Sequence, residues 1–156
     1  MQELDCYTDA SYAKDVGGSF IAYKMGDFPI WLQYLEGVKN TQAEVFSARQ
    51  CVRVARALHP NHVINVYTDC QAVIRKEPRQ KNVNFFKVEG HPKTKQKDER
   101  QQVFSQVDRT ARKALREMRK EKAAALKEGA QLGIQGQSGI YDAKASATKT
   151  KWSETI

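Results

Sequence analysis

The sequence predicts an α/β protein in which helices flank a mixed β-sheet. Two observations predict this class. Short runs of β-branched and aromatic residues alternate with two longer stretches of helical periodicity. The chain has 156 residues, which is enough for one domain with an apolar core and too few for two ordinary domains.

Three apolar segments at the start of the chain predict antiparallel strands. They cover residues 3 to 9, 18 to 25 and 29 to 37, and the turn sequences DVGG and GDFP separate them. Because both connections are short, we expect two consecutive hairpins.

The middle of the chain predicts a helix followed by two more strands. Helical periodicity extends over residues 41 to 59, and the unbroken apolar run 62 to 69 predicts a strand that is buried on both faces. A short helix or turn at 70 to 77 precedes a fifth strand at 83 to 90. A right-handed crossover through the helix would place strand 62 to 69 parallel to strand 3 to 9.

The end of the chain predicts a long helix and a tail. The helix begins near Asp98 and continues beyond Met118, with one apolar stripe: Val103, Phe104, Val107, Ala111, Ala114, Leu115 and Met118. We expect residues 1 to 122 to form the domain, and residues 123 to 156 to hold a helix extension and then a flexible tail. Trp152 is either an incidental tail aromatic or a docking element for a protein partner.

Composition restricts the class of partner and the environment. The formal charge of +8 favours a polyanion, because lysine and arginine release the counterions condensed on a phosphate backbone. Cys6, Cys51 and Cys70 are an odd number without metal-ligand spacing, so we expect reduced thiols. No apolar stretch approaches the length of a membrane span. We therefore expect a cytoplasmic monomer that has no signal segment and does not bind membranes.

The tripeptide YTD ends two of the predicted strands, at Asp9 and at Asp69. If these strands are parallel neighbours, both aspartates lie side by side at one end of the sheet. The flanking sequences share nothing, so the repeat is not an internal duplication. We interpret it as two strands that deliver carboxylates to one place.

Two helices offer further carboxylates, each with a competing structural explanation. Glu44 begins the apolar stripe of the first helix, but Thr41 and Glu44 also fit a capping box, which the local pattern alone favours. Asp108 lies inside the stripe of the last helix, where a lone carboxylate is costly, unless it pairs with Arg112. Asp98 precedes that stripe and is better explained as an N-cap.

Four acidic residues, Asp9, Glu44, Asp69 and Asp108, can thus converge. An oxygen-only cluster suits Mg²⁺, with Mn²⁺ as a substitute, and argues against zinc. His91 follows the fifth strand in a basic loop, where a histidine is usually only solvated. Beside a metal site it becomes a candidate proton shuttle.

In this order the motifs resemble the ribonuclease H family. The matching segments lie between residue 3 and about residue 118: YTDAS, GGSFIAY, KNTQAE, YTDC, VEGH and QVDRTARKAL. The resemblance implies a five-stranded mixed sheet and an endonuclease that hydrolyses the RNA strand of RNA/DNA hybrids by two-metal-ion catalysis, with two Mg²⁺ ions holding the scissile phosphate between them. It implies Asp9, Glu44, Asp69 and Asp108 as metal ligands and His91 as the residue that assists water activation or product release.

The resemblance also implies the residues that contact the substrate. Ser11, Asn40 and Gln42 match positions that touch the RNA strand near its 2′-hydroxyls. Thr41 stands where the family usually has a second asparagine. The loop after His91 is longer than the family pattern leads us to expect. Asp98 therefore remains an alternative to Asp108 as the fourth metal ligand.

The sequence leaves two other functions open. One is a non-catalytic nucleic-acid-binding module that kept the fold, although a binder of phosphates gains nothing from four carboxylates. The other is a junction resolvase on the same fold. About a dozen residues separate Asp69 from Asn82, which is too few for the extra basic helix that some members of the family use to bind the hybrid. The basic segments RKEPRQK and HPKTKQK are candidates for binding the substrate in its place. Each is equally well explained as a run of solvated charges.

Overall fold

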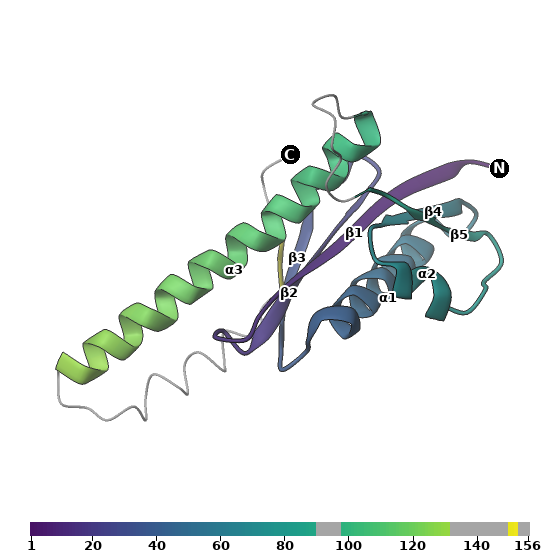
Figure 1. Cartoon of the computed structure of the whole chain (residues 1–156). Coiled ribbons are helices and arrows are strands. Elements are labelled where there is room, and N and C mark those ends of the chain that lie inside the picture. Colours follow the sequence, from purple (N-terminus) through teal and green to yellow (C-terminus); the bar gives the residue numbers. More distant parts are fainter. Residues whose placement is uncertain (90–97, 132–149, 153–156) are drawn as a thin grey trace.

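The computed structural model describes residues 1–89, 98–131 and 150–152, which form a mixed sheet with helices on both faces (Figure 1). The strands are β1 (Glu3–Ala13), β2 (Gly18–Met25), β3 (Trp31–Glu36), β4 (Val63–Thr68), β5 (Val83–Lys87) and β6 (Thr150–Trp152). The helices are α1 (Asn40–Leu58), α2 (Gln71–Lys76) and α3 (Glu99–Gln131).

The strand order is β5-β4-β1-β2-β3-β6. β1, β2 and β3 form the two predicted antiparallel hairpins, and β4 lies parallel to β1 after the α1 crossover. β5 continues the parallel part of the sheet beside β4. The prediction of a mixed sheet, including the parallel placement of β4, is confirmed.

Each face of the sheet has its own apolar core, because alternate residues of a strand point to opposite faces. On one face Cys51, Val52 and Ala55 of α1 pack against the strands. On the other face Phe104 and Val107 of α3 do the same. Figure 1 shows α1 and α3 on opposite sides of the sheet. The helical stripes predicted from sequence are therefore the surfaces that the sheet buries.

The first hairpin depends on two glycines. Gly17 has a φ of 84°, in the left-handed region that favours glycine. A Cβ on Gly18 would lie 2.4 Å from the Tyr34 hydroxyl and 2.5 Å from the Leu35 carbonyl oxygen. Only glycine therefore lets β2 begin so close to β3. The pairing of Ala13 with Gly18 also carries β1 four residues beyond its predicted end.

The last part of the chain differs from the prediction. α3 reaches Gln131, so the expected helix extension is present. The expected tail, however, contributes a strand: β6 pairs antiparallel with β3, from Trp31 opposite Trp152 to Gln33 opposite Thr150. The prediction of an unstructured tail is wrong for these three residues. A local pattern cannot reveal such a strand, because its hydrogen-bond partners lie more than a hundred residues away in the chain.

Two remaining predictions concern thiols and membranes. Cys6, Cys51 and Cys70 are all free, and the first two are fully buried in the core between α1 and the sheet. No helix within the described residues combines the length and the apolar character needed to cross a bilayer.

Candidate active site

The two YTD tripeptides lie side by side. Tyr7 pairs with Tyr67 in the parallel ladder of β1 and β4, so two residues further along each strand Asp9 and Asp69 are neighbours. Asp9 is only 4% exposed. The explanation of the repeat as two strands that bring carboxylates together is therefore confirmed.

Glu44 joins the two aspartates from the first turns of α1. Each of Asp9, Glu44 and Asp69 offers a carboxylate oxygen, and these oxygens lie within 4.8 Å of one another. Glu44 accepts a hydrogen bond from the backbone N–H of Ala10, next to Asp9. We call these three residues the carboxylate cluster.

The alternative explanation of Glu44 as part of a capping box is wrong. The N-cap residue of α1 is Lys39, and no side-chain hydrogen bond caps the helix. Thr41 is exposed within the first turn, whereas Glu44 is turned toward the sheet. The same four-residue motif would suit a cap, but burial of the α1 stripe rotates Glu44 away from the helix end.

Crowding of the acids changes their protonation. Burial raises the pKa of Asp9, and the nearby Glu44 and a hydrogen bond with Asp108 raise it further. Burial, followed by the charge of Asp69, raises the pKa of Glu44 to about 8. Without a cation the cluster therefore retains protons near neutral pH.

The donor set fits a hard divalent cation. All three groups offer carboxylate oxygens, which Mg²⁺ and Mn²⁺ prefer. Oε2 of Glu44 is buried without a hydrogen-bond partner among the described residues. Burying an oxygen of this kind without a partner is costly, and a bound cation would supply the missing partner.

Asp108 has two partners, and they match the two explanations that the sequence offers: a member of the acidic cluster and a salt bridge with Arg112. Its side chain hydrogen-bonds with Asp9, which ties α3 to the carboxylate cluster. It also forms an ion pair with Arg112 one turn later. The three-residue cluster does not include Asp108, so its place is beside Asp9 at the edge of the cluster.

Asp98 is the N-cap of α3, as its position before the apolar stripe predicts. Its carboxylate accepts a hydrogen bond from the Gln101 N–H at 2.8 Å, and the Gln101 side chain accepts one from the Asp98 N–H at 3.1 Å. This reciprocal pair is a capping box. Asp108, and not Asp98, contacts Asp9. Of the two candidates for the fourth ligand, Asp108 is therefore the better placed.

The expected substrate contacts lie around the cluster. Asn40, Thr41 and Gln42 form the exposed first turn of α1, and Asn40 has a φ of 35°. Ser11 follows Asp9 by two residues in β1, so its side chain points to the same face of the sheet. His91 lies outside the described residues.

A row of aromatic residues beside the cluster was not predicted. Tyr7, Tyr67 and Phe86 stack across β1, β4 and β5, with successive ring centroids 5.2 Å apart. The Arg100 guanidinium lies 4.4 Å from the centre of the Tyr67 ring and pairs with Asp5 at 3.1 Å. The tyrosines of the two YTD tripeptides were the sequence feature that could have indicated this row. Their contact, however, depends on the register of β1 and β4.

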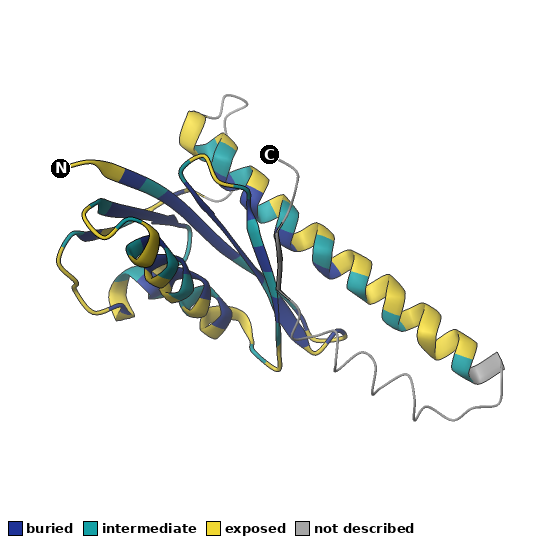
Figure 2. Cartoon of the chain, turned by 180° about the vertical axis from the view of Figure 1, so that it is seen from behind, coloured by how far each residue is buried: buried dark blue, intermediate teal, exposed yellow. Residues whose placement is uncertain are grey.

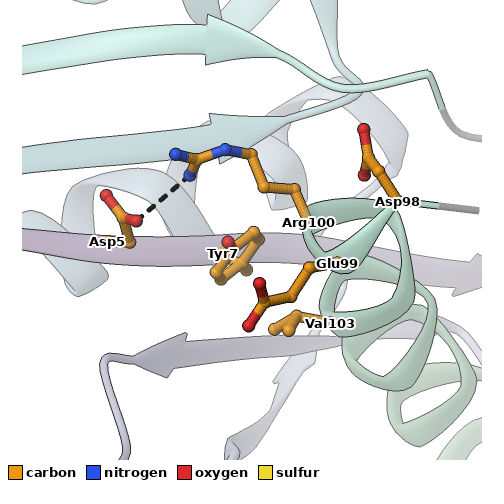
Figure 3. A pocket seen from close by; sticks show the side chains of 6 residues that line it. All are labelled: Asp5, Tyr7, Asp98, Glu99, Arg100 and Val103. Carbon is orange, nitrogen blue, oxygen red and sulfur yellow. Dashed lines mark hydrogen bonds and ion pairs between the residues drawn. The ribbon is translucent and has the colours of Figure 1, made fainter.

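A pocket opens between this row and the start of α3 (Figure 3). Its lining consists of Asp5, Tyr7, Asp98, Glu99, Arg100 and Val103. None of the cluster residues lines it. The pocket is therefore separate from the carboxylate cluster.

Comparison with known proteins places the fold. No protein-family model matches the chain, and no curated protein matches it. Among solved structures, the chain is similar to a crystal structure of LC11-RNase H1 in complex with an RNA/DNA hybrid. The two share 15% identity and a TM-score of 0.52 over 72% of this chain and 99% of that one.

A second structure of LC11-RNase H1, an enzyme isolated from compost by a metagenomic approach, gives 17% identity and a TM-score of 0.50. The match covers 74% of this chain and 99% of that one. At such identities the likeness concerns the fold. The chain is thus an α/β protein with the ribonuclease H-like fold, as the sequence resemblance implies, and carries β6 as an addition at the sheet edge.

Proposed function

We propose that this protein is an endonuclease that hydrolyses the RNA strand of RNA/DNA hybrids with the help of Mg²⁺. The observation that carries the proposal is the convergence of Asp9, Glu44 and Asp69 from β1, α1 and the end of β4, on a ribonuclease H-like fold. The solved structure with a bound hybrid supports the choice of substrate class.

The proposed roles follow from position. Asp9, Glu44 and Asp69 would hold the metal, which when bound supplies an activated water and stabilises the leaving oxygen. Asp108 would orient Asp9 through their hydrogen bond and serve as the fourth ligand. His91 is proposed to assist proton transfer.

Selectivity for RNA is proposed to come from hydrogen bonds to 2′-hydroxyls in a wide minor groove. The exposed first turn of α1, with Asn40, Thr41 and Gln42, adjoins the cluster because Glu44 lies in the next turn of the same helix. Ser11 lies on the same strand as Asp9. These four residues are the proposed contacts to the RNA strand.

The test is incubation of labelled RNA/DNA hybrid, duplex DNA, duplex RNA and a four-way junction with the protein and Mg²⁺. We expect internal cleavage of the RNA strand of the hybrid alone, and none in excess chelator. Asp69→Asn should remove cleavage, because it removes a cluster carboxylate. Asp98→Asn is the matched control, since Asp98 is exposed and asparagine is an equally good N-cap.

Three outcomes would overturn the proposal. Cleavage that persists in chelator would exclude the metal mechanism. Preferred cutting of the junction would favour a resolvase, and binding of the hybrid without any cutting would favour a non-catalytic module.

A further inference from the structure

The outer face of α3 carries a row of basic residues, which we call the basic stripe: Arg109, Lys113, Arg116, Lys120 and Lys127. Their spacings of four, three, four and seven residues place them on one side of a helix. The buried residues Val107 and Ala111 lie on the opposite side. The basic stripe therefore points away from the sheet into solvent.

The charges of the stripe are not neutralised within the described residues. None of its five members forms an ion pair there, whereas the neighbouring Arg112 and Arg119 pair with Asp108 and Asp15. Arg109 donates one hydrogen bond, to the Ser105 carbonyl of its own helix.

The acids of the helix lie elsewhere on its surface. Glu117, Glu121 and Glu128 each follow a stripe residue by one position, which turns them about 100° around the helix. No acid lies in the row itself; Glu117 flanks it beside Lys113 and Lys120, and Ala123 and Ala124 separate Lys120 from Lys127.

The second half of α3 projects beyond the sheet (Figure 1). The last buried side chain of the helix is Leu115, and within the described residues the last side-chain hydrogen bond from the helix to the sheet domain runs from Lys122 to the Val16 carbonyl at 2.5 Å. Residues 123 to 128 are all exposed, and Leu126 is 69% exposed. In Figure 2 the projecting part of α3 is mostly yellow, the colour of exposed residues. Core burial does not account for this projection, since most helices in proteins are stabilised by a packed face.

We propose that the basic stripe binds the sugar-phosphate backbone of duplex nucleic acid, outside the part held at the carboxylate cluster. Arg109 directly follows Asp108, so along the helix axis the stripe begins level with the edge of the cluster, about 100° around the helix from Asp108, and leads away from it. From Arg109 to Lys127 it spans about 27 Å, which equals about 8 base pairs of duplex. One duplex can therefore contact both places.

Charge and composition favour this occupant over a lipid surface. A helix that lies on a membrane opposes its basic face with large apolar side chains. In the projecting half of α3, Leu126 is the one large exposed apolar residue before the helix ends. Phosphates recognised by shape and charge alone need no such apolar face.

The decisive measurement is fluorescence anisotropy of a labelled hybrid of about 24 base pairs, long enough to cover the stripe, in excess chelator and over a range of salt concentrations. The stripe variant combines Lys113→Gln, Arg116→Gln and Lys120→Gln. Glutamine has nearly the helix propensity of lysine and arginine, so circular dichroism should not change. The affinity of the stripe variant for the hybrid should fall at least about tenfold compared with the parent. The slope of log K against log salt should become shallower by about 2 to 3.

Two further variants make the result specific. Arg53→Gln with Arg75→Gln and Lys76→Gln removes the same charge from exposed positions of α1 and α2, two of them in the segment RKEPRQK. This variant compares the stripe with that other basic segment, and it should lower the affinity and the salt slope by less than the stripe variant does. Lys113→Arg with Lys120→Arg keeps the charge and should bind as the parent does. An equal loss in the stripe variant and the α1–α2 variant, or no loss in the stripe variant, overturns the proposal.

The inference rests on the proposed function only for the choice of a hybrid as the probe. If the parent binds through the stripe but cuts nothing in Mg²⁺, the nuclease proposal is wrong and the proposal that the stripe binds the duplex backbone is supported. If the parent cuts the hybrid and the stripe variant binds with unchanged affinity and slope, the stripe proposal fails alone.

Discussion

Neutralising Glu44 by the substitution Glu44→Gln is expected to stabilise the metal-free protein near pH 8 and to leave its stability nearly unchanged near pH 5. The reason is the crowding of carboxylates. Burial and the charge of Asp69 raise the pKa of Glu44 to about 8. Glutamine keeps the shape and the oxygen that accepts the Ala10 N–H, but it carries no charge at any pH.

The sign follows from proton linkage. Between the ordinary value of 4.5 and about 8, the unfolded parent has lost the Glu44 proton and the folded parent still holds it. The stability that this carboxyl contributes is complete below the lower value and is lost as the pH rises toward the higher one. The variant has no such group and escapes this loss.

Two routes give a similar magnitude. Two unit charges at the 4.8 Å limit of the cluster repel by about 3.5 kcal/mol at an effective dielectric near 20. Linkage gives about 1.4 kcal/mol per pH unit, or about 4 kcal/mol from pH 5 to pH 8. We expect the variant to exceed the parent by about 3 kcal/mol near pH 8.

The assay is urea unfolding followed by circular dichroism, in chelator, near pH 5 and near pH 8. Asp98→Asn is the control, because it neutralises an exposed carboxylate that lies outside the cluster. It should behave as the parent at both pH values. A Glu44→Gln protein that is less stable than the parent near pH 8, or that differs equally at both values, would refute the electrostatic argument.

Three further outcomes are expected. Mg²⁺ should raise the melting temperature of the parent by more than that of Asp69→Asn, because a ligand bound only by the folded state stabilises it by mass action; equal shifts would place the metal elsewhere. Asp98→Ala should cost about 1 kcal/mol in urea unfolding and spare hybrid cleavage, because it breaks the capping box with Gln101; a dead enzyme would make Asp98 a ligand. A chain ending at Lys122 loses the projecting end of α3 and the three-residue strand β6, and should still keep its cooperative thermal transition, because β6 pairs with the sheet edge over three residues only and α3 packs on the sheet before Lys122; a fall of ten degrees or more, about 3 kcal/mol for a domain of this size, would show that the removed residues stabilise the domain by more than this short edge pairing.

Local patterns in the sequence determined the strands of the two hairpins, β4 and the buried stripes of α1 and α3. These features follow from periodicity, which depends only on which side chains can share a face. The parallel neighbourhood of β1 and β4 also followed, because a right-handed crossover leaves few alternatives. The sequence alone therefore predicts that Asp9 and Asp69 are neighbours.

The tertiary structure decided the questions that depend on distant partners. The local pattern of Thr41 and Glu44 favoured a capping box, and only packing of α1 against the sheet turned Glu44 toward Asp9. Asp108 shows the same dependence, since its contact with Asp9 joins residues that lie 99 positions apart in the chain.

The register and the edges of the sheet were likewise beyond the reach of local pattern. The stacking of Tyr7 on Tyr67 requires one particular register, because a slip of one residue would turn every side chain to the other face. β6 exists only because β3 offers an open edge. The sequence by itself thus determined which elements form and which acids can meet, and the three-dimensional contacts determined which of these acids do meet, because burial and hydrogen bonding between remote segments outweigh local preference.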